Sequence, residues 1–299
     1  MKIISLLIFS FINVSNIFAQ DSSLIKDIED TSPVTEKVTG AFKSTRVINA
    51  HSVEMLSRGD MDFRILHRFG FVSDGVKQLF GLDAASFRMS FDFGITDNLT
   101  LGVGRSTFRK ELDGFVKQRI FQQTKGAKNI PFTLVLAAGY TVYTQEVLGS
   151  KPTVADRSAY YVQLIAGRKF SQKFSLQLSP ILVHTNIPFV TTDDRNIFAI
   201  GGGARFKVSK RTAITADYHY PFGQFDENYT NPLSLGVDIE TGGHVFQLHF
   251  SNATGLNERA YITQTTGDFF KGDVRLGFNI SRMFKVGRKK KLTAIPQSD

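Results

Sequence analysis

The sequence SFRMSFDFGITDNLTLGVGRS, residues 86–106, determines the fold class of this chain. Large apolar residues stand at every second position before and after the polar turn Thr96-Asp97-Asn98. The positions between them carry polar residues or glycine, among them Arg88 and Asp92. Because successive side chains of a strand point to opposite faces, each half has one apolar and one polar face. The stretch therefore predicts a pair of antiparallel strands joined by a tight turn.

The same alternation recurs to the end of the chain and predicts a barrel. We expect twelve strands, at residues 61–71, 86–95, 98–107, 113–122, 131–145, 158–170, 174–184, 196–208, 212–222, 233–239, 244–252 and 273–284. These lengths suit the roughly 9–11 residues that a tilted membrane strand needs. The expected fold is all-β, a single closed antiparallel up-and-down transmembrane β-barrel over residues 61–284, with ten or fourteen strands as the fallback.

The connections alternate between short and long. Short polar turns are expected at residues 96–98, 171–173, 209–211 and 240–243, and long polar stretches at 72–85, 146–157, 185–195, 223–232 and 253–272. Outer-membrane barrels show this asymmetry, with short turns on the periplasmic rim and long loops outside. An even number of strands would leave both termini in the periplasm. A soluble sandwich or lipocalin-like barrel is the competing architecture, because alternation alone does not say which face is outside.

The two ends of the chain are expected to lie outside the barrel. Residues 1–19 read as a cleaved secretory signal, with an uncleaved anchor as the alternative. Residues 20–60 read as a polar, partly disordered periplasmic leader, in which 46–58 are compatible with an early strand, a short helix or a plug. Residues 285–299 read as a basic periplasmic tail.

Composition excludes several classes of function. The chain has no cysteine, which excludes disulfides and thiol chemistry, and no apolar run long enough for a membrane helix. The formal net charge of +9 comes from residues spread along strands, so we expect outer-membrane lipids and not nucleic acid as partners. The histidines lack metal-ligand spacing, and no metal or cofactor is expected. Gly201-Gly202-Gly203 lies within a strand, where glycine allows bending or close approach of bulky neighbours.

Four stretches resemble an uncharacterised family of outer-membrane β-barrel proteins of Gram-negative bacteria. They are GDMDFRILHRFG (59–70), GITDNLTLGVGRS (94–106), PLSLGVDIETGGHVFQLH (232–249) and GDVRLGFNISR (272–282). With the spacing between them they span nearly all of the chain after Arg46. The resemblance implies a barrel in the outer membrane, and it supplies no activity.

A second resemblance concerns catalysis. His249, Ser251 and Asn252 resemble the His-x-Ser-Asn-Gly signature of outer-membrane phospholipase A, in which the histidine is the base and the serine the nucleophile. The match is incomplete, because Ala253-Thr254 displaces the glycine. The strand parity also directs His249 and Ser251 to the lumen, whereas a lipase needs its nucleophile within reach of lipid. A hydrolase using these residues is therefore the alternative to a non-enzymatic barrel.

The residues predicted to face the lumen are mostly cationic. The candidates are Arg64, Arg68, Arg88, Asp92, Arg105, Lys117, Arg119, Arg205, Asp217, His249 and Arg275. If a passage remains between them, the cationic surplus favours small anionic solutes. If the charges pair with one another, they close the path. The sequence thus predicts a narrow anion-preferring channel or a plugged structural barrel whose loops bind a partner.

Overall fold

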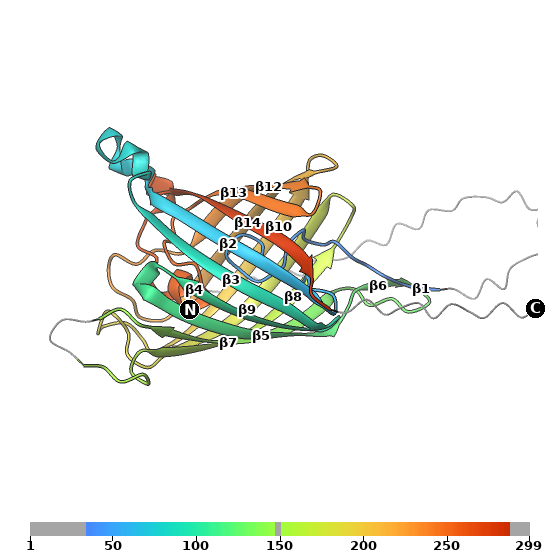
Figure 1. Ribbon diagram of the computed structural model, residues 1–299, viewed down its shortest axis with the longest axis horizontal. Helices are drawn as coiled ribbons and strands as arrows, with labels where there is room; N and C mark the ends of the chain where they lie inside the picture. Colours follow the sequence, from blue (N-terminus) through green and yellow to red (C-terminus); the bar gives the residue numbers. More distant parts are fainter. Residues whose placement is uncertain (1–33, 147–150, 288–299) are drawn as a thin grey trace, which may run out of the picture. The chain divides into compact units, whose positions relative to one another are not determined.

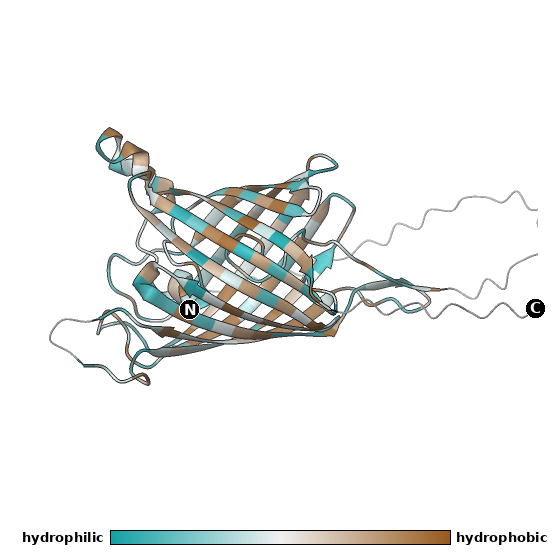
Figure 2. Cartoon of the chain, viewed as in Figure 1, coloured by the Kyte–Doolittle hydropathy of each residue, from teal (hydrophilic) through white to brown (hydrophobic). Residues whose placement is uncertain are grey.

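Side chains alternate between the two faces of the strands, and the apolar face points outward. A computed structural model describes residues 34–146 and 151–287. On strand β3 (Ala85–Thr96), Phe87 and Met89 are each 40% exposed, whereas Arg88 is 0% exposed. Brown and teal residues alternate along the strands in Figure 2. A soluble barrel would place its apolar face inside, so this pattern is that of a membrane barrel.

Within the described residues, twelve antiparallel strands close into one barrel (Figure 1). Besides β3 they are β2 (Asp60–Phe71), β4 (Leu99–Ser106), β5 (Glu111–Phe121), β7 (Thr133–Tyr143), β8 (Ser158–Lys169), β9 (Phe174–Thr185), β10 (Asn196–Lys207), β11 (Thr212–Phe222), β12 (Leu233–Thr241), β13 (His244–Ser251) and β14 (Arg275–Lys285). Each strand pairs with its neighbours in the chain, and β14 pairs with β2 to close the barrel. The fold class and strand number are confirmed.

The short elements lie in the connections between the barrel strands, except for β1, which precedes β2. They are the strands β1 (Thr35–Lys37) and β6 (Thr124–Gly126), the helix α1 (Glu258–Thr263) and the 3-10 turns η1 (Val72–Asp74), η2 (Val76–Gly81), η3 (Phe108–Lys110) and η4 (Phe269–Lys271). No described helix is long and apolar enough to cross a membrane.

The two ends of the barrel differ in their connections. The loop end carries the connection of β2 to β3 and every second one after it, and the turn end carries the others. Two connections depart from the expected alternation. At the loop end, β4 and β5 are joined by only residues 107–110, and at the turn end, residues 122–132 form a longer connection. The latter is long because β6 within it pairs with β1.

The expected domain boundary at residue 61 needs correction. Residues 41–56, which we call the lumen hairpin, are largely buried inside the barrel and are not part of an external leader. Of the alternatives for 46–58, the structure shows the plug. The expected signal (1–19), the first part of the leader (20–33), part of the 146–157 loop (147–150) and most of the basic tail (288–299) lie outside the described residues.

Candidate functional site

The lumen hairpin is a tight reverse turn. Val47 N–H donates to the Ala50 carbonyl over 2.9 Å, and Ser52 N–H donates to the Thr45 carbonyl over 2.9 Å. The segment from Ser44 to Val53 is at most 8% exposed. A chain that is irregular and buried in this way must find partners for its main-chain groups. The barrel wall supplies them.

Asp217 of β11 holds the tip of the hairpin. Its Oδ2 accepts from the backbone N–H groups of Ile48 (3.2 Å), Asn49 (2.7 Å) and Ala50 (3.3 Å). Consecutive N–H groups of a turn form a concave site that suits an anion, and hydrogen bonds to an ionised acceptor are the stronger kind. Asp217 was predicted to face the lumen, and there it binds the protein's own backbone.

Side-chain amides bind the carbonyls of the same turn. Gln247 Nε2 donates to Val47 O (2.5 Å), Asn279 Nδ2 to Ile48 O (3.0 Å), and Gln177 Nε2 to His51 O (2.7 Å). These amides come from β9 and from the neighbouring strands β13 and β14. With Asp217 of β11, they bond the hairpin to the half of the wall that runs from β9 to β14.

Three predicted lumen cations also contact the hairpin. Arg64 Nη2 donates to Thr45 Oγ1 (2.6 Å) and to Asp62 Oδ2 (2.6 Å). Arg68 Nη2 donates to Asn49 Oδ1 (2.5 Å). Lys117 Nζ donates to the carbonyls of Thr45 (3.3 Å) and Glu54 (2.7 Å). These cations thus line no open path, because the hairpin occupies the space in front of them.

Inward-facing glycines leave room for the hairpin. A Cβ at Gly203 would lie 2.9 Å from Val47 Cγ2, and a Cβ at Gly167 would lie 2.6 Å from Val53 Cγ1. Both distances are shorter than a carbon–carbon contact allows. The close approach expected of the Gly201–Gly203 run is explained by the hairpin at Gly203.

A second segment enters the lumen from the loop end. Residues 252–265, which we call the lumen loop, include α1 and are mostly buried. The side chain of Asn257 caps α1 by accepting from Ala260 N–H (2.9 Å). Glu111 of β5 fixes the helix to the wall, accepting from Asn257 Nδ2 (2.5 Å) and pairing with Arg259.

The two segments meet at Glu258. Its Oε1 lies 2.7 Å from Arg46 Nη1 and 3.3 Å from His51 Nε2, and all three side chains are at most 3% exposed. His51 also lies 3.1 Å from the Tyr161 hydroxyl of β8. The lumen is therefore occupied from both ends, and the carboxylate of Glu258 joins the two segments.

The remaining predicted lumen residues lie in different places. Arg88 makes a two-bond ion pair with Asp113 (2.8 and 2.5 Å), and Asp92 and Arg205 are buried. Arg119 lies at the rim of the turn end, where its Nη2 donates to Asp97 O (2.7 Å). Arg275 lies at the rim of the loop end, stacked 3.5 Å over the ring of Phe71.

The assignment of Arg105 to the lumen was wrong. On β4, Thr100 and Gly102 point inward and are buried, whereas Leu101, Val103 and Arg105 point outward and are exposed. Strict alternation requires this, since Arg105 is an even number of positions from Leu101.

The side chains of His249, Ser251 and Asn252 are buried on the lumen side, and each is hydrogen-bonded to other residues of the barrel. Arg68 Nε donates to His249 Nε2 (3.1 Å), and Arg68 Nη1 donates to Ser251 Oγ (3.2 Å). Ser234 Oγ donates to Ser251 Oγ (2.8 Å), and Asn252 Oδ1 accepts from Leu233 N–H (2.8 Å). Among the bonds of the described residues, none joins His249 to Ser251. A general base must reach the proton that it removes, and here an arginine occupies the histidine's Nε2.

Two cavities lie among the loops of the loop end, with Phe108, Arg109 and Thr254 in both linings. Desolvation lowers the pKa of the Arg109 guanidinium, and it raises the pKa of the Asp193 carboxyl in the second cavity. In the described part of the chain, no group of three or more His, Asp or Glu side chains is arranged to hold a metal.

Sequence reasoning missed Glu111, Glu258 and the fact that Gln177, Gln247 and Asn279 bind the hairpin, although it placed Gln247 among the hydrogen-bonding residues of the lumen. The alternation identifies two of these residues as facing the lumen, because Gln247 and Asn279 occupy polar positions of the alternating pattern in their strands. Nothing in the periodicity marks Glu258, which lies in a loop.

Comparisons with known proteins agree with the fold. The sequence model of a family described as "Membrane bound beta barrel domain (DUF5777)" matches residues 42–284, which include all of the lumen hairpin except Ala41. No curated protein sequence matches the chain significantly.

Solved structures resemble the chain at low identity. The NanC porin has a TM-score of 0.47 and 9% identity, over 75% of this chain and 99% of its own. The KdgM porin has 0.46 and 10%, over the same shares. Outer membrane phospholipase A from Escherichia coli has 0.38 and 13%, over 79% of this chain and 97% of its own. These likenesses concern architecture alone.

Proposed function

The chain belongs to the DUF5777 family of membrane-bound β-barrel domains, and from this premise we propose that it is a non-enzymatic outer-membrane barrel with a sealed lumen. In this proposal the loop end faces the exterior, and both termini lie in the periplasm. Its outward apolar face contacts outer-membrane lipid. Its role is carried by the loops, which bind a ligand or partner, and not by a permanently open pore.

The observation that carries the proposal is the occupied lumen. The hairpin binds the side chains of Asp217, Gln247, Asn279 and Gln177 in the wall. From the loop end, Glu258 of the lumen loop forms an ion pair with Arg46 of the hairpin. Withdrawing the hairpin would exchange these hydrogen bonds for bonds to water and would expose its buried apolar side chains Val47, Ile48 and Val53. Both changes favour the closed state over an open one.

The bonds of His249 and Ser251 support a non-enzymatic role. Both side chains are at most 1% exposed, and Arg68 binds both of them. Lipid would contact the opposite face of β13, where Leu248 and Phe250 are exposed. We expect no lipid hydrolysis by the purified protein, and a serine-dependent hydrolysis that Ser251→Ala abolished would contradict this.

A second candidate, a gated anion channel, rests on the cations behind the hairpin. If the hairpin withdrew, Arg64, Arg68 and Lys117 would lose partners in it and face the passage. Cationic rings lower the barrier for anions. This function requires an opening signal, because the lumen is occupied in the structure.

Single-channel recording in planar bilayers tests both candidates. We expect silence from the unaltered protein, and discrete anion-preferring conductance after the lumen hairpin (41–56) and the lumen loop (252–265) are both deleted, because each of them occupies the lumen. A steady conductance of the unaltered protein would overturn the sealed barrel. A reversible conductance of the unaltered protein on addition of a solute would support the gated channel. Absence of conductance with every solute tested would support the sealed barrel whose loops bind a ligand or partner.

A further inference from the structure

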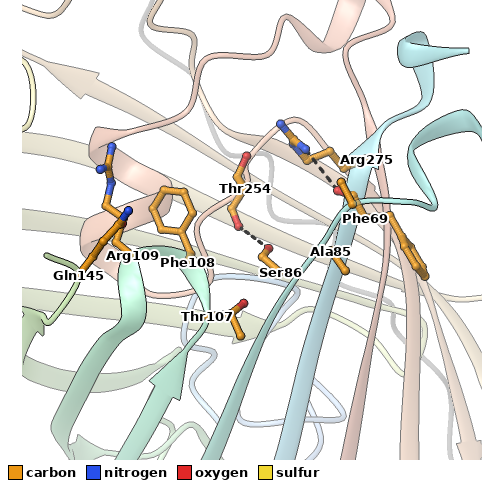
Figure 3. A pocket seen from close by; sticks show the side chains of 11 residues that line it. Phe69, Ala85, Ser86, Thr107, Phe108, Arg109, Gln145, Thr254 and Arg275 are labelled. Carbon is orange, nitrogen blue, oxygen red and sulfur yellow. Dashed lines mark hydrogen bonds between the residues drawn. The ribbon is translucent and has the colours of Figure 1, made fainter. Parts of the chain in front are cut away.

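A cavity of about 430 Å³ opens at the loop end, beside the ends of β2 and β3 and the turn η3 (Figure 3). Its lining includes Phe69, Ser86, Thr107, Phe108, Arg109 and Arg275. We call it the rim cavity. Figure 3 shows Arg109 and Arg275 on opposite sides of it, with Thr254 between them.

Both arginines are held in place by aromatic rings. Arg275 lies 3.5 Å over the ring of Phe71, and Arg109 lies 3.5 Å over the ring of Phe189. Stacking fixes the plane of a guanidinium and leaves N–H groups at its edge free to donate. The two cations are therefore oriented before any ligand arrives.

The rim cavity has an excess of positive charge. No Asp or Glu lines it, and in the described part of the chain neither arginine forms an ion pair. Arg275 donates only to the Phe69 carbonyl (3.3 Å), and its buried Nε has no partner. Arg109 Nε donates to the Gln264 side chain (3.1 Å). Two carboxylates, Asp74 and Asp273, lie near Arg275 but outside the lining, and Asp273 accepts from the Ser73 hydroxyl (3.0 Å).

The backbone that carries Arg109 is strained. Arg109 and Lys110 both have φ of 50°, in the left-handed region that L side chains rarely adopt. Hydrogen bonds from Gln145 N–H to Arg109 O (3.2 Å) and from Thr144 Oγ1 to Lys110 O (2.7 Å) hold this conformation. Strain of this kind concentrates at ligand-binding sites, where it fixes the position of a side chain.

We propose that the rim cavity binds an anionic group, a phosphate or carboxylate, carried on an apolar body. The guanidinium edges would take the anion, and Phe69 and Phe108 would contact the body. The cavity extends from the outward strand face, where Ala85 lies, to the inward face, where Ser86 lies. The anion can therefore come from a lipid headgroup or from a solute. This inference names the ligand class of the loop-binding role above and rests on it.

Isothermal titration calorimetry on the full-length protein in a non-ionic detergent tests the proposal, with phenyl phosphate as the probe and benzyl alcohol as its neutral counterpart. We expect saturable binding of phenyl phosphate alone. Arg109→Gln and Arg275→Gln should each weaken it about tenfold or more, because each removes a charge-assisted hydrogen bond. Arg195→Gln, at an exposed arginine outside the cavity, is the matched control and should bind as the unaltered protein does.

Nanodiscs of phosphatidylcholine with and without phosphatidic acid distinguish the two sources. Loss of phenyl phosphate binding in the presence of phosphatidic acid supports a lipid headgroup, and unchanged binding supports a solute. Absence of binding to the unaltered protein, or equal weakening by Arg195→Gln, would overturn the rim site. Either result leaves the sealed lumen intact, because that claim depends on conductance.

Discussion

The lumen hairpin and the lumen loop fill the same barrel, but they are held differently. The hairpin is irregular, and its main-chain groups bind Asp217, Gln247, Asn279 and Gln177 of four strands. The lumen loop forms one short capped helix, α1, and its carbonyls also bind side chains outside the loop, such as those of Arg68 and Tyr229.

The lumen loop also packs the apolar side chains of Leu256, Tyr261 and Ile262 into the interior of the barrel, where they are fully buried. Its charged connections run chiefly through Glu111 and Glu258. The difference teaches that the hairpin is bonded to the wall mainly through its main-chain groups at the turn, whereas the loop is fixed by the ion pairs of Glu111 and Glu258 and by its buried apolar side chains.

The largest effect is expected at the tip of the hairpin. Asp217→Ala removes the acceptor of three backbone N–H groups, and the free energy of unfolding should fall by about 3 kcal/mol. Guanidinium unfolding of the vesicle-inserted protein measures it, and trypsin should gain access to Arg46. Asp217→Asn keeps one acceptor oxygen and should lose only about 1 kcal/mol. An unchanged stability of the alanine variant would mean that the tip does not depend on the wall.

The next effect is expected where the two segments meet. Glu258→Gln keeps the shape of the side chain but removes the charge that pairs with Arg46, so stability should fall by about 2 kcal/mol. A double-mutant cycle with Arg46→Gln should give a coupling energy above about 1 kcal/mol. Additive losses in that cycle would show that the hairpin and the loop are held independently.

A smaller effect is expected where the hairpin presses on the wall. Gly203→Ala places a Cβ 2.9 Å from Val47, and overpacking should lower the free energy of unfolding by about 1 kcal/mol. Gly202→Ala is the matched control, because a Cβ there meets nothing within 4 Å. Equal effects at the two neighbouring glycines would contradict the packing of the hairpin against β10.

The smallest effect is expected where the hairpin reaches solvent. Lys43 pairs with Glu240 over 2.7 Å, but the two side chains are 36% and 37% exposed. Lys43→Gln should change the free energy of unfolding by less than about 0.5 kcal/mol, since water and salt screen exposed pairs. A large loss, measured by the same unfolding titration, would place the entry of the hairpin among its main anchors.

The strand pattern was predictable because it repeats. Phe87, Met89 and Phe91 on one face and Arg88, Ser90 and Asp92 on the other carry a local signal that needs no knowledge of the fold. The pattern was misapplied at Arg105, which was assigned to the lumen although strict alternation places it outside with Leu101 and Val103. It gave no indication of Glu258, which lies in a loop, and Glu111 was missed because the expected strand began two residues later, at 113.

The sequence by itself determined a barrel of twelve alternating strands with one polar face, because side-chain direction in a strand follows from position alone. Only the tertiary structure decided that the polar face surrounds a hairpin from residues 41–56 and not water. The physical reason is that the hairpin has no period of its own. Its conformation comes from hydrogen bonds to Asp217, Gln247 and Asn279, and these meet only when the barrel closes around it.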